Sequence, residues 1–151
     1  MQIFSILSFG SNKHAYECDI KKHYKNGELP TVKRGFYGEI LTLKNVSVEH
    51  LKPWSQGGRT EWKNVVLASK KLNTIRGKKD IKTVVNPVAA LKYFEQFRGI
   101  RVGNFDGDKY IKLAIDNLKE MGVYLTSPGV RKKMKERPFK KTAQQLRRSI
   151  R

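Results

Sequence analysis

The sequence predicts an α+β fold in which a small β-rich unit in the middle of the chain is flanked by helices. β-Favouring runs at residues 46–51 and 64–68 lie on either side of a glycine-rich loop, and a helical segment follows at 70–76. Further along the chain, apolar residues recur at helical rather than alternating spacing. We therefore divide the chain into an N-terminal flanking segment (1–39), a core (40–80), a helical flanking region (81–126) and a basic C-terminal tail (127–151).

The charge of the chain points to an anionic partner. The 151 residues suit one domain with a modest core. The net charge is +19, from 32 Lys and Arg against 13 Asp and Glu, and such an excess repels itself unless an anion binds. Nucleic acid is the leading candidate because phosphate contacts release counterions. An anionic membrane surface is the rival, but no lipid-anchor signal or membrane-spanning stretch is evident. We expect a nucleic-acid partner and no membrane.

Cysteine usage and the N-terminus indicate a cytoplasmic protein. Cys18 is the single cysteine, which excludes a disulfide within the chain and a structural zinc site made of paired Cys-x-x-Cys motifs. The apolar run at 2–9 has no basic region before it and no small-residue cleavage site after it. We interpret this run as a buried strand and not as a signal peptide.

Before the core, the pattern predicts a helix and a further strand. Residues 15–25 carry apolar side chains at helical spacing, and Asn26-Gly27 ends the pattern. Residues 36–43 alternate loosely, which favours a strand, and Lys44-Asn45 fits a tight turn.

The core reads as strand, long loop, strand and short helix. The run at 46–51 alternates, and Pro53 ends it because proline cannot donate to a ladder. A loop at 54–63 leads to the second strand at 64–68. Ser69 is a favourable N-cap, and Gly77 is a favourable stop for the helix at 70–76.

After a polar linker at 78–86, two helices are expected. Pro87 suits the first position of a helix that places Leu91, Phe94 and Phe97 on one face. Asp106-Gly107-Asp108 caps a second helix that runs through Met121 to a stop at Gly122, with Ile111, Ile115 and Leu118 on one stripe. Residues 123–125 fit a short strand.

The tail at 127–151 is rich in Lys and Arg, and Glu136 is its single acid. One interpretation is a solvated basic tail, and the other is an arm that orders on phosphates. The arm is favoured because apolar residues interrupt the charge: Met134, Phe139, Leu146 and Ile150.

Four polar residues of the core suit phosphodiester hydrolysis. A water must lose a proton near neutral pH, which suits histidine, here His50. The phosphoryl charge calls for a divalent cation with oxygen ligands. Glu49 and His50 are neighbours on a strand and point to opposite sides, and Asn73 can bring an amide oxygen from the helix. Asn64, at the exit of the loop, can bond across the base of the loop and fix the position of His50.

The order and spacing of these residues resemble a known family. Glu49-His50, Asn64 after thirteen residues, Asn73 after eight more, and then Arg76-Gly77-Lys78 resemble the HNH nucleases of the ββα-metal (His-Me finger) superfamily. The resemblance covers about residues 40–80 and is closest to phage or mobile-element members without zinc-binding cysteines. Two features depart from the family pattern: no Cys-x-x-Cys pair braces the core, and Glu49 stands where Asp is usual.

The resemblance implies a role for each residue. His50 would be the general base, Glu49 and Asn73 would be ligands of one Mg²⁺ or Mn²⁺ ion, and Asn64 would brace the loop. Arg76 and Lys78 would approach the phosphate, and the cut would leave a 5′-phosphate and a 3′-hydroxyl. The full set of expected nucleic-acid contacts is Lys52, Arg59, Lys70, Lys71, Arg76, Lys78, Arg131, Lys132 and Lys133.

The expected function is a metal-dependent DNA endonuclease acting on double-stranded DNA in a bacterial or phage-infected cell. A monomer would nick one strand, and a dimer would cut both. The alternatives are a non-catalytic nucleic-acid-binding protein on a degenerate HNH fold and a component of a larger nucleoprotein complex. Trp54 and Trp62, in the loop, are either packing anchors or platforms for base stacking, and the first interpretation is favoured.

Overall fold

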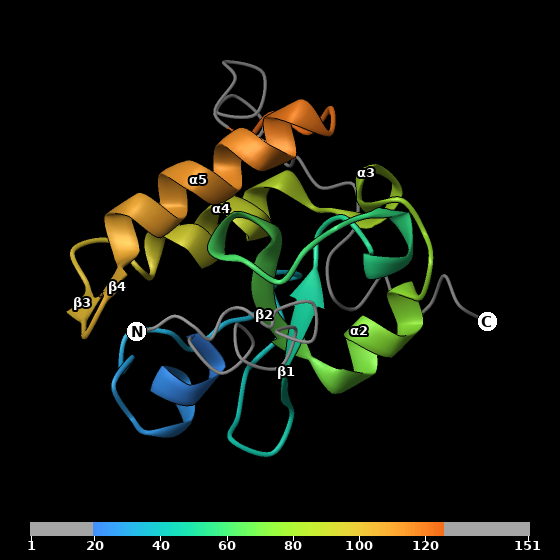
Figure 1. Ribbon diagram of the computed structural model, residues 1–151. Helices are drawn as coiled ribbons and strands as arrows, with labels where there is room; N and C mark the ends of the chain where they lie inside the picture. Colours follow the sequence, from blue (N-terminus) through green and yellow to red (C-terminus); the bar gives the residue numbers. More distant parts are fainter. Residues whose placement is uncertain (1–19, 126–151) are drawn as a thin grey trace.

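The computed structural model describes residues 20–125, which form an α+β fold (Figure 1). At its centre β1 (Val46–His50) pairs antiparallel with β2 (Val65–Ser69), in a register that runs from Val46 opposite Ser69 to His50 opposite Val65. α2 (Lys70–Arg76) follows β2 directly and packs on both strands. The predicted α+β class is confirmed, as is the order strand, loop, strand, helix.

β2 is buried along its whole length, which its apolar sequence allows. Two helices supply partners for its main chain on the side away from β1. The Tyr93 hydroxyl of α4 (Pro87–Glu95) accepts from the Leu67 amide at 2.8 Å, and the Tyr110 hydroxyl of α5 (Gly107–Glu120) donates to the Val65 carbonyl at 2.8 Å. A two-stranded sheet is marginal in water, so these helices hold the hairpin.

The helix boundaries follow the predicted caps. Ser69 accepts from the Leu72 amide at the start of α2, and Gly77 ends that helix. Pro87 lies at the first turn of α4. Asp106 accepts from the amides of residues 108 and 109 at the start of α5. These caps satisfy amides that the first turn of a helix leaves without partners.

The strand predicted at 36–43 is wrong. Residues 36–38 form a turn that the Gly38 amide closes on the Gly35 carbonyl at 2.9 Å, and Gly38 has a φ of +92°. The buried Glu39 carboxylate accepts from the amides of Tyr37 and Ser69. This carboxylate therefore links the turn to the end of β2. The buried rings of Phe36 and Tyr37, which we predicted to belong to a strand, enter the core from a loop.

Three further predictions are corrected. The linker at 78–86 contains α3 (Ile81–Val84), which Asp80 caps, and residues 123–125 are buried at Val123 and Leu125 without forming a strand. The second strand begins at Val65 and not at Asn64. A hairpin of β3 (Arg101–Val102) and β4 (Phe105–Asp106) was not predicted.

Other predictions concern residues outside the described part of the chain. The strand at 2–9, the first part of the helix at 15–25 and the tail at 127–151 lie there, while residues 20–25 are helical. Within the described residues 20–125, no helix is long and apolar enough to cross a membrane.

The loop between β1 and β2 contains two short 3₁₀ turns, η2 (Trp54–Gln56) and η3 (Trp62–Asn64). α5 packs against η3. In Figure 1, α4 and α5 lie on one side of the hairpin and α2 lies on the other. The loop and α2 therefore flank the end of β1 that carries Glu49 and His50.

Candidate functional site

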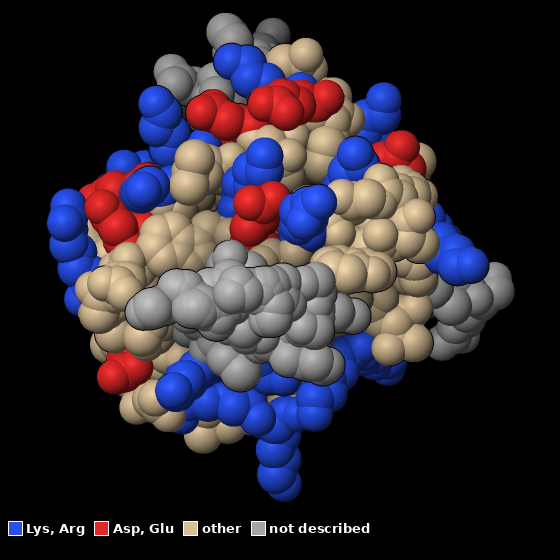
Figure 2. Space-filling model, viewed as in Figure 1, with Lys and Arg blue, Asp and Glu red and all other residues tan. Residues whose placement is uncertain are grey.

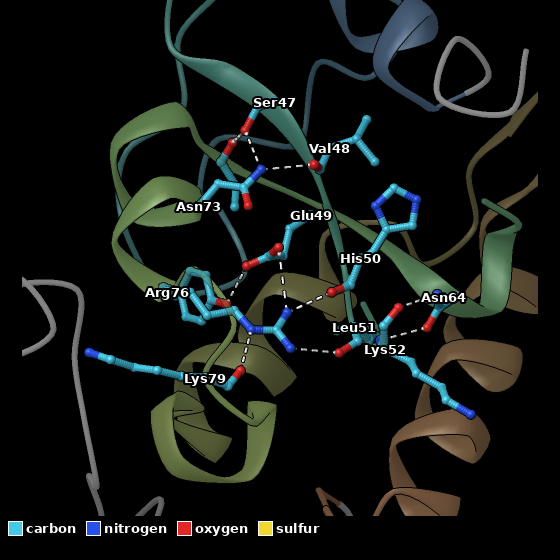
Figure 3. Close-up of polar contacts among 12 residues, drawn as sticks. Ser47, Val48, Glu49, His50, Leu51, Lys52, Asn64, Asn73, Arg76 and Lys79 are labelled. Carbon is cyan, nitrogen blue, oxygen red and sulfur yellow. Dashed lines mark hydrogen bonds and ion pairs between the residues drawn. The ribbon is translucent and has the colours of Figure 1, made fainter. Parts of the chain in front are cut away.

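Glu49, His50 and Asn73, which are brought together by β1 and α2, line one pocket of about 230 Å³. Trp54 and Arg76 also contribute to its wall. Figure 3 shows Asn73 and Arg76 of α2 on the side of β1 to which the Glu49 side chain points. The pocket thus joins the predicted base with both predicted metal ligands.

The Glu49 carboxylate is only 5% exposed and has two partners. The Tyr37 hydroxyl donates to Oε2 at 2.7 Å, and Arg76 Nη1 lies 3.4 Å from Oε1. Burial raises the pKa of the Glu49 carboxyl above its ordinary value, and the Arg76 guanidinium and the Tyr37 hydroxyl oppose that rise. Tyr37 and Arg76 thus favour the ionised carboxylate inside the protein.

Asn73 is anchored to β1 through its amide nitrogen. Nδ2 donates to the Val48 carbonyl at 2.9 Å and to Ser47 Oγ at 3.3 Å. These contacts fix the amide plane, and among the described residues no hydrogen-bond partner is seen for Oδ1. Asn73 therefore has an oxygen to offer to the pocket that it lines.

The His50 imidazole is half-buried, and its Nε2 lies 2.7 Å from Thr60 Oγ1. Thr60 is itself buried, so its hydroxyl is a fixed partner. Which atom donates depends on the tautomer of the ring. In Figure 3 the His50 ring leaves β1 on a different side from the Glu49 carboxylate, as neighbours on a strand do.

Asn64 closes the base of the loop, as the sequence predicted. Its Oδ1 accepts from the Lys52 amide at 2.9 Å, and its Nδ2 donates to the carbonyls of Lys52 (3.0 Å) and Arg59 (2.9 Å). Asn117 of α5 adds a bond to Oδ1 at 3.2 Å. Asn64 is 3% exposed, so it acts as an internal bracket. The bracket holds the main chain of Lys52, two residues after His50.

Replacement of Asn64 by alanine is expected to destabilise the protein by about 1–3 kcal/mol, because it leaves buried main-chain groups without partners. Urea unfolding would measure this loss, and Asn64→Asp would test the donor bonds because it keeps the acceptor and removes Nδ2. Asn104→Ala, in the turn between β3 and β4, is a control expected to change stability by less than about 0.5 kcal/mol. An Asn64→Ala protein as stable as the wild type would contradict the bracket.

Arg76 occupies a different position from the one that the resemblance implied. It is 1% exposed, and its guanidinium donates to the carbonyls of His50 (2.6 Å), Leu51 (2.9 Å) and Lys79 (2.9 Å). All three bonds lie inside the protein, and Figure 3 shows the guanidinium surrounded by these partners and by Glu49. The expected phosphate contact at Arg76 is therefore corrected to a structural support beneath the pocket.

The other expected nucleic-acid contacts within the described residues are exposed: Lys52, Arg59, Lys70, Lys71 and Lys78. Lys52 and Arg59 belong to the loop that Asn64 closes, and the three lysines belong to α2 and the turn after it. Lys and Arg side chains are spread over the face of the molecule shown in Figure 2. The expected contacts at Arg131, Lys132 and Lys133 lie outside the described residues.

The residues of the pocket fit a hard divalent cation. They offer one carboxylate, from Glu49, and one amide oxygen, from Asn73. Mg²⁺ commonly binds through one or two carboxylates and completes its shell with waters and substrate phosphates. Within residues 20–125 no group of three or more His, Cys, Asp or Glu side chains could hold a metal ion.

Three supporting residues were not identified from the sequence: Tyr37, Thr60 and Asn117. Each contacts a predicted site residue from a separate segment of the chain. Tyr37 is in the turn wrongly predicted as a strand, and Asn117 is in a helix 53 residues from its partner. No local pattern marks such residues, since only the tertiary fold creates their contacts.

Comparisons with known proteins returned no match: no family model matches the chain, and neither a curated protein nor a solved structure matches it.

Proposed function

We propose that this protein is a metal-dependent DNA endonuclease on a ββα-metal core of the HNH type. The observation that carries the proposal is that Glu49, His50 and Asn73 line one pocket. They reach it from β1 and α2, and Asn64 closes the loop that joins the two strands. The resemblance in the sequence assigns chemistry to these same four residues.

In this proposal each residue has one task. His50 accepts a proton from the attacking water, and Thr60 holds the imidazole in place. Glu49 and Asn73 would hold a Mg²⁺ or Mn²⁺ ion, which when bound supplies positive charge for the phosphoryl oxygens and the departing oxygen. Asn64 keeps the loop in place beside His50. The family resemblance implies that the bond between phosphorus and the 3′-oxygen breaks as the water oxygen bonds to phosphorus; the 3′-oxygen then takes a proton from solvent, which leaves a 5′-phosphate and a 3′-hydroxyl.

The charge of the protein supports a nucleic-acid substrate. The net charge is +19, and exposed lysines of α2 and basic residues of the loop lie on the two elements that flank the pocket. A phosphate backbone approaching the pocket would meet positive charge from both elements. DNA is proposed over RNA because of the family resemblance.

One observation favours a second candidate, a nucleic-acid-binding protein that does not cut. Arg76 lies 3.4 Å from Glu49 and places a positive charge beside the carboxylate that a cation needs. If the guanidinium weakens the cation site enough, the fold binds DNA without hydrolysing it. Cleavage and binding assays on one preparation separate the two candidates.

The full-length protein with Mg²⁺ or Mn²⁺ is expected to convert supercoiled plasmid to the open circular form, and excess EDTA is expected to stop the conversion. The reason is that hydrolysis needs the charge of the cation at the phosphoryl group. Agarose gels over time would measure the reaction, and linear product formed without prior nicking would indicate a dimer. If plasmid and single-stranded DNA are both bound, seen as a gel shift, but neither is ever cut with either cation, the enzyme is rejected and the second candidate is favoured.

Cation binding is expected to raise the melting temperature of the wild type, and Glu49→Ala and Asn73→Ala are expected to remove that rise. A ligand at about 100 times its Kd stabilises the folded state by about 2.7 kcal/mol. Melting curves with and without Mn²⁺ would measure the effect. Glu120→Ala, which removes an exposed carboxylate at the end of α5, is the matched control and keeps the rise. A rise that persists in both ligand variants would place the cation elsewhere.

A further inference from the structure

The two tryptophans of the loop are in different environments. Trp62 packs edge-on against Phe105 with ring centroids 5.2 Å apart and lies against the core. Trp54 is 48% exposed, and within residues 20–125 it has no aromatic partner. A large ring gains stability from burial, so folding accounts for the position of Trp62 and not for that of Trp54.

Trp54 lines the same pocket as Glu49, His50 and Asn73. A residue in this wall lies next to the phosphate that the proposed reaction would cleave. The base of a nucleotide that adjoins this phosphate would therefore lie near Trp54.

The loop holds Trp54 in a fixed place. The Gly57 and Gly58 amides donate to the carbonyls of Trp54 and Pro53, both at 3.0 Å. Gly58 packs so closely that an added Cβ would lie 1.8 Å from the Lys52 carbonyl oxygen. With the Asn64 bracket, these contacts make η2 a rigid support. A ring on a rigid support loses little conformational entropy when it stacks on a ligand.

The surroundings of Trp54 fit a nucleotide better than a protein partner. Ser55, Gln56, Lys52 and Arg59 are all exposed in this loop, so the exposed indole has polar and cationic residues as its neighbours in the loop. Protein partners favour contiguous apolar patches. An aromatic ring beside positive charges is the arrangement that binds a base and its phosphates.

We propose that Trp54 is a stacking platform for an unpaired nucleobase next to the cleaved phosphate. Both faces of a base inside a duplex are covered by its neighbours, so the indole can stack only on a base that has left the duplex. The preferred substrate is therefore single-stranded DNA, or a duplex with an unpaired base at the cut. The inference rests on the proposed function because it uses the cleavage pocket to place the base.

Binding in metal-free buffer tests the inference without requiring cleavage. Fluorescence anisotropy would compare the full-length wild type and Trp54→Ala on a labelled single strand, the matched duplex and the same duplex with one unpaired base. Loss of one stacked base is expected to weaken binding to the single strand and to the duplex with the unpaired base by about 5- to 100-fold. Binding to the matched duplex is expected to change little. Trp54→Phe, which keeps an aromatic ring, is expected to bind nearly as the wild type does.

Lys52→Ala is the matched control in the same loop. It is expected to weaken binding to all three DNAs alike and to reduce the dependence of affinity on salt. Equal losses on all three DNAs with Trp54→Ala, or no loss on any, would overturn the inference. Because the ring is exposed, unchanged melting of Trp54→Ala would verify that the fold is intact. A protein that cuts none of plasmid, single-stranded DNA and the duplex with an unpaired base, but shows the Trp54 effect, would reject the endonuclease and keep the stacking platform.

Discussion

Replacement of His50 by alanine is expected to slow plasmid cleavage by about 10²–10⁴-fold, the usual contribution of a positioned general base. His50 lines the pocket, and its half-buried imidazole lies 2.7 Å from Thr60 Oγ1. Loss of the ring removes the group that takes the proton from water, while the cation ligands stay in place. Initial nicking rates at saturating Mg²⁺ would measure the effect, and a gel shift would verify that DNA still binds.

His23→Ala is the matched control for that experiment. His23 lies outside the pocket and contacts Glu28 at 2.7 Å, so its loss is expected to leave the nicking rate unchanged. Thr60→Val keeps the shape of the buried threonine and removes its hydroxyl, and it is expected to slow cleavage less than His50→Ala does. If His50→Ala nicks plasmid as fast as the wild type, His50 is not the base even though the protein is a nuclease.

The core of the fold could be predicted from the sequence because its signals are local. Alternation and Pro53 marked the end of β1, and Ser69 and Gly77 marked the ends of α2. The bracket at Asn64 also followed from its place at the exit of the loop, since a buried amide there can bond both sides of the loop base.

The failures arise where tertiary contacts overrule local patterns. Residues 36–43 alternate loosely and begin with two aromatic residues, which favoured a strand, but the buried Glu39 carboxylate holds residues 36–38 in a turn. The role of Arg76 was predicted from its charge. Arg76 lies one helical turn after Asn73, and its side chain points toward the end of β1. There the carbonyls of His50 and Leu51 accept from the guanidinium, and the Glu49 carboxylate lies 3.4 Å away.

Replacement of Arg76 by methionine is expected to destabilise the protein by about 3–5 kcal/mol, the usual cost of breaking a buried ion pair. The side chain is 1% exposed, and its loss leaves the Glu49 carboxylate without its cation and three carbonyls without a donor. A domain of ordinary size has only about 5–15 kcal/mol of stability, so a large part of the total would be lost. Urea unfolding of the two proteins would measure it.

Two comparisons separate this structural role from a phosphate contact. Lys78→Met removes an exposed charge two residues away and is expected to change stability by less than about 0.5 kcal/mol. Combining Arg76→Met with Glu49→Gln is expected to cost less than the sum of the two single changes, because the paired charges leave together. If Arg76→Met instead kept full stability and weakened DNA binding as Lys78→Met does, the guanidinium would face the phosphate. The support beneath Glu49 and His50 would then have to come from other residues.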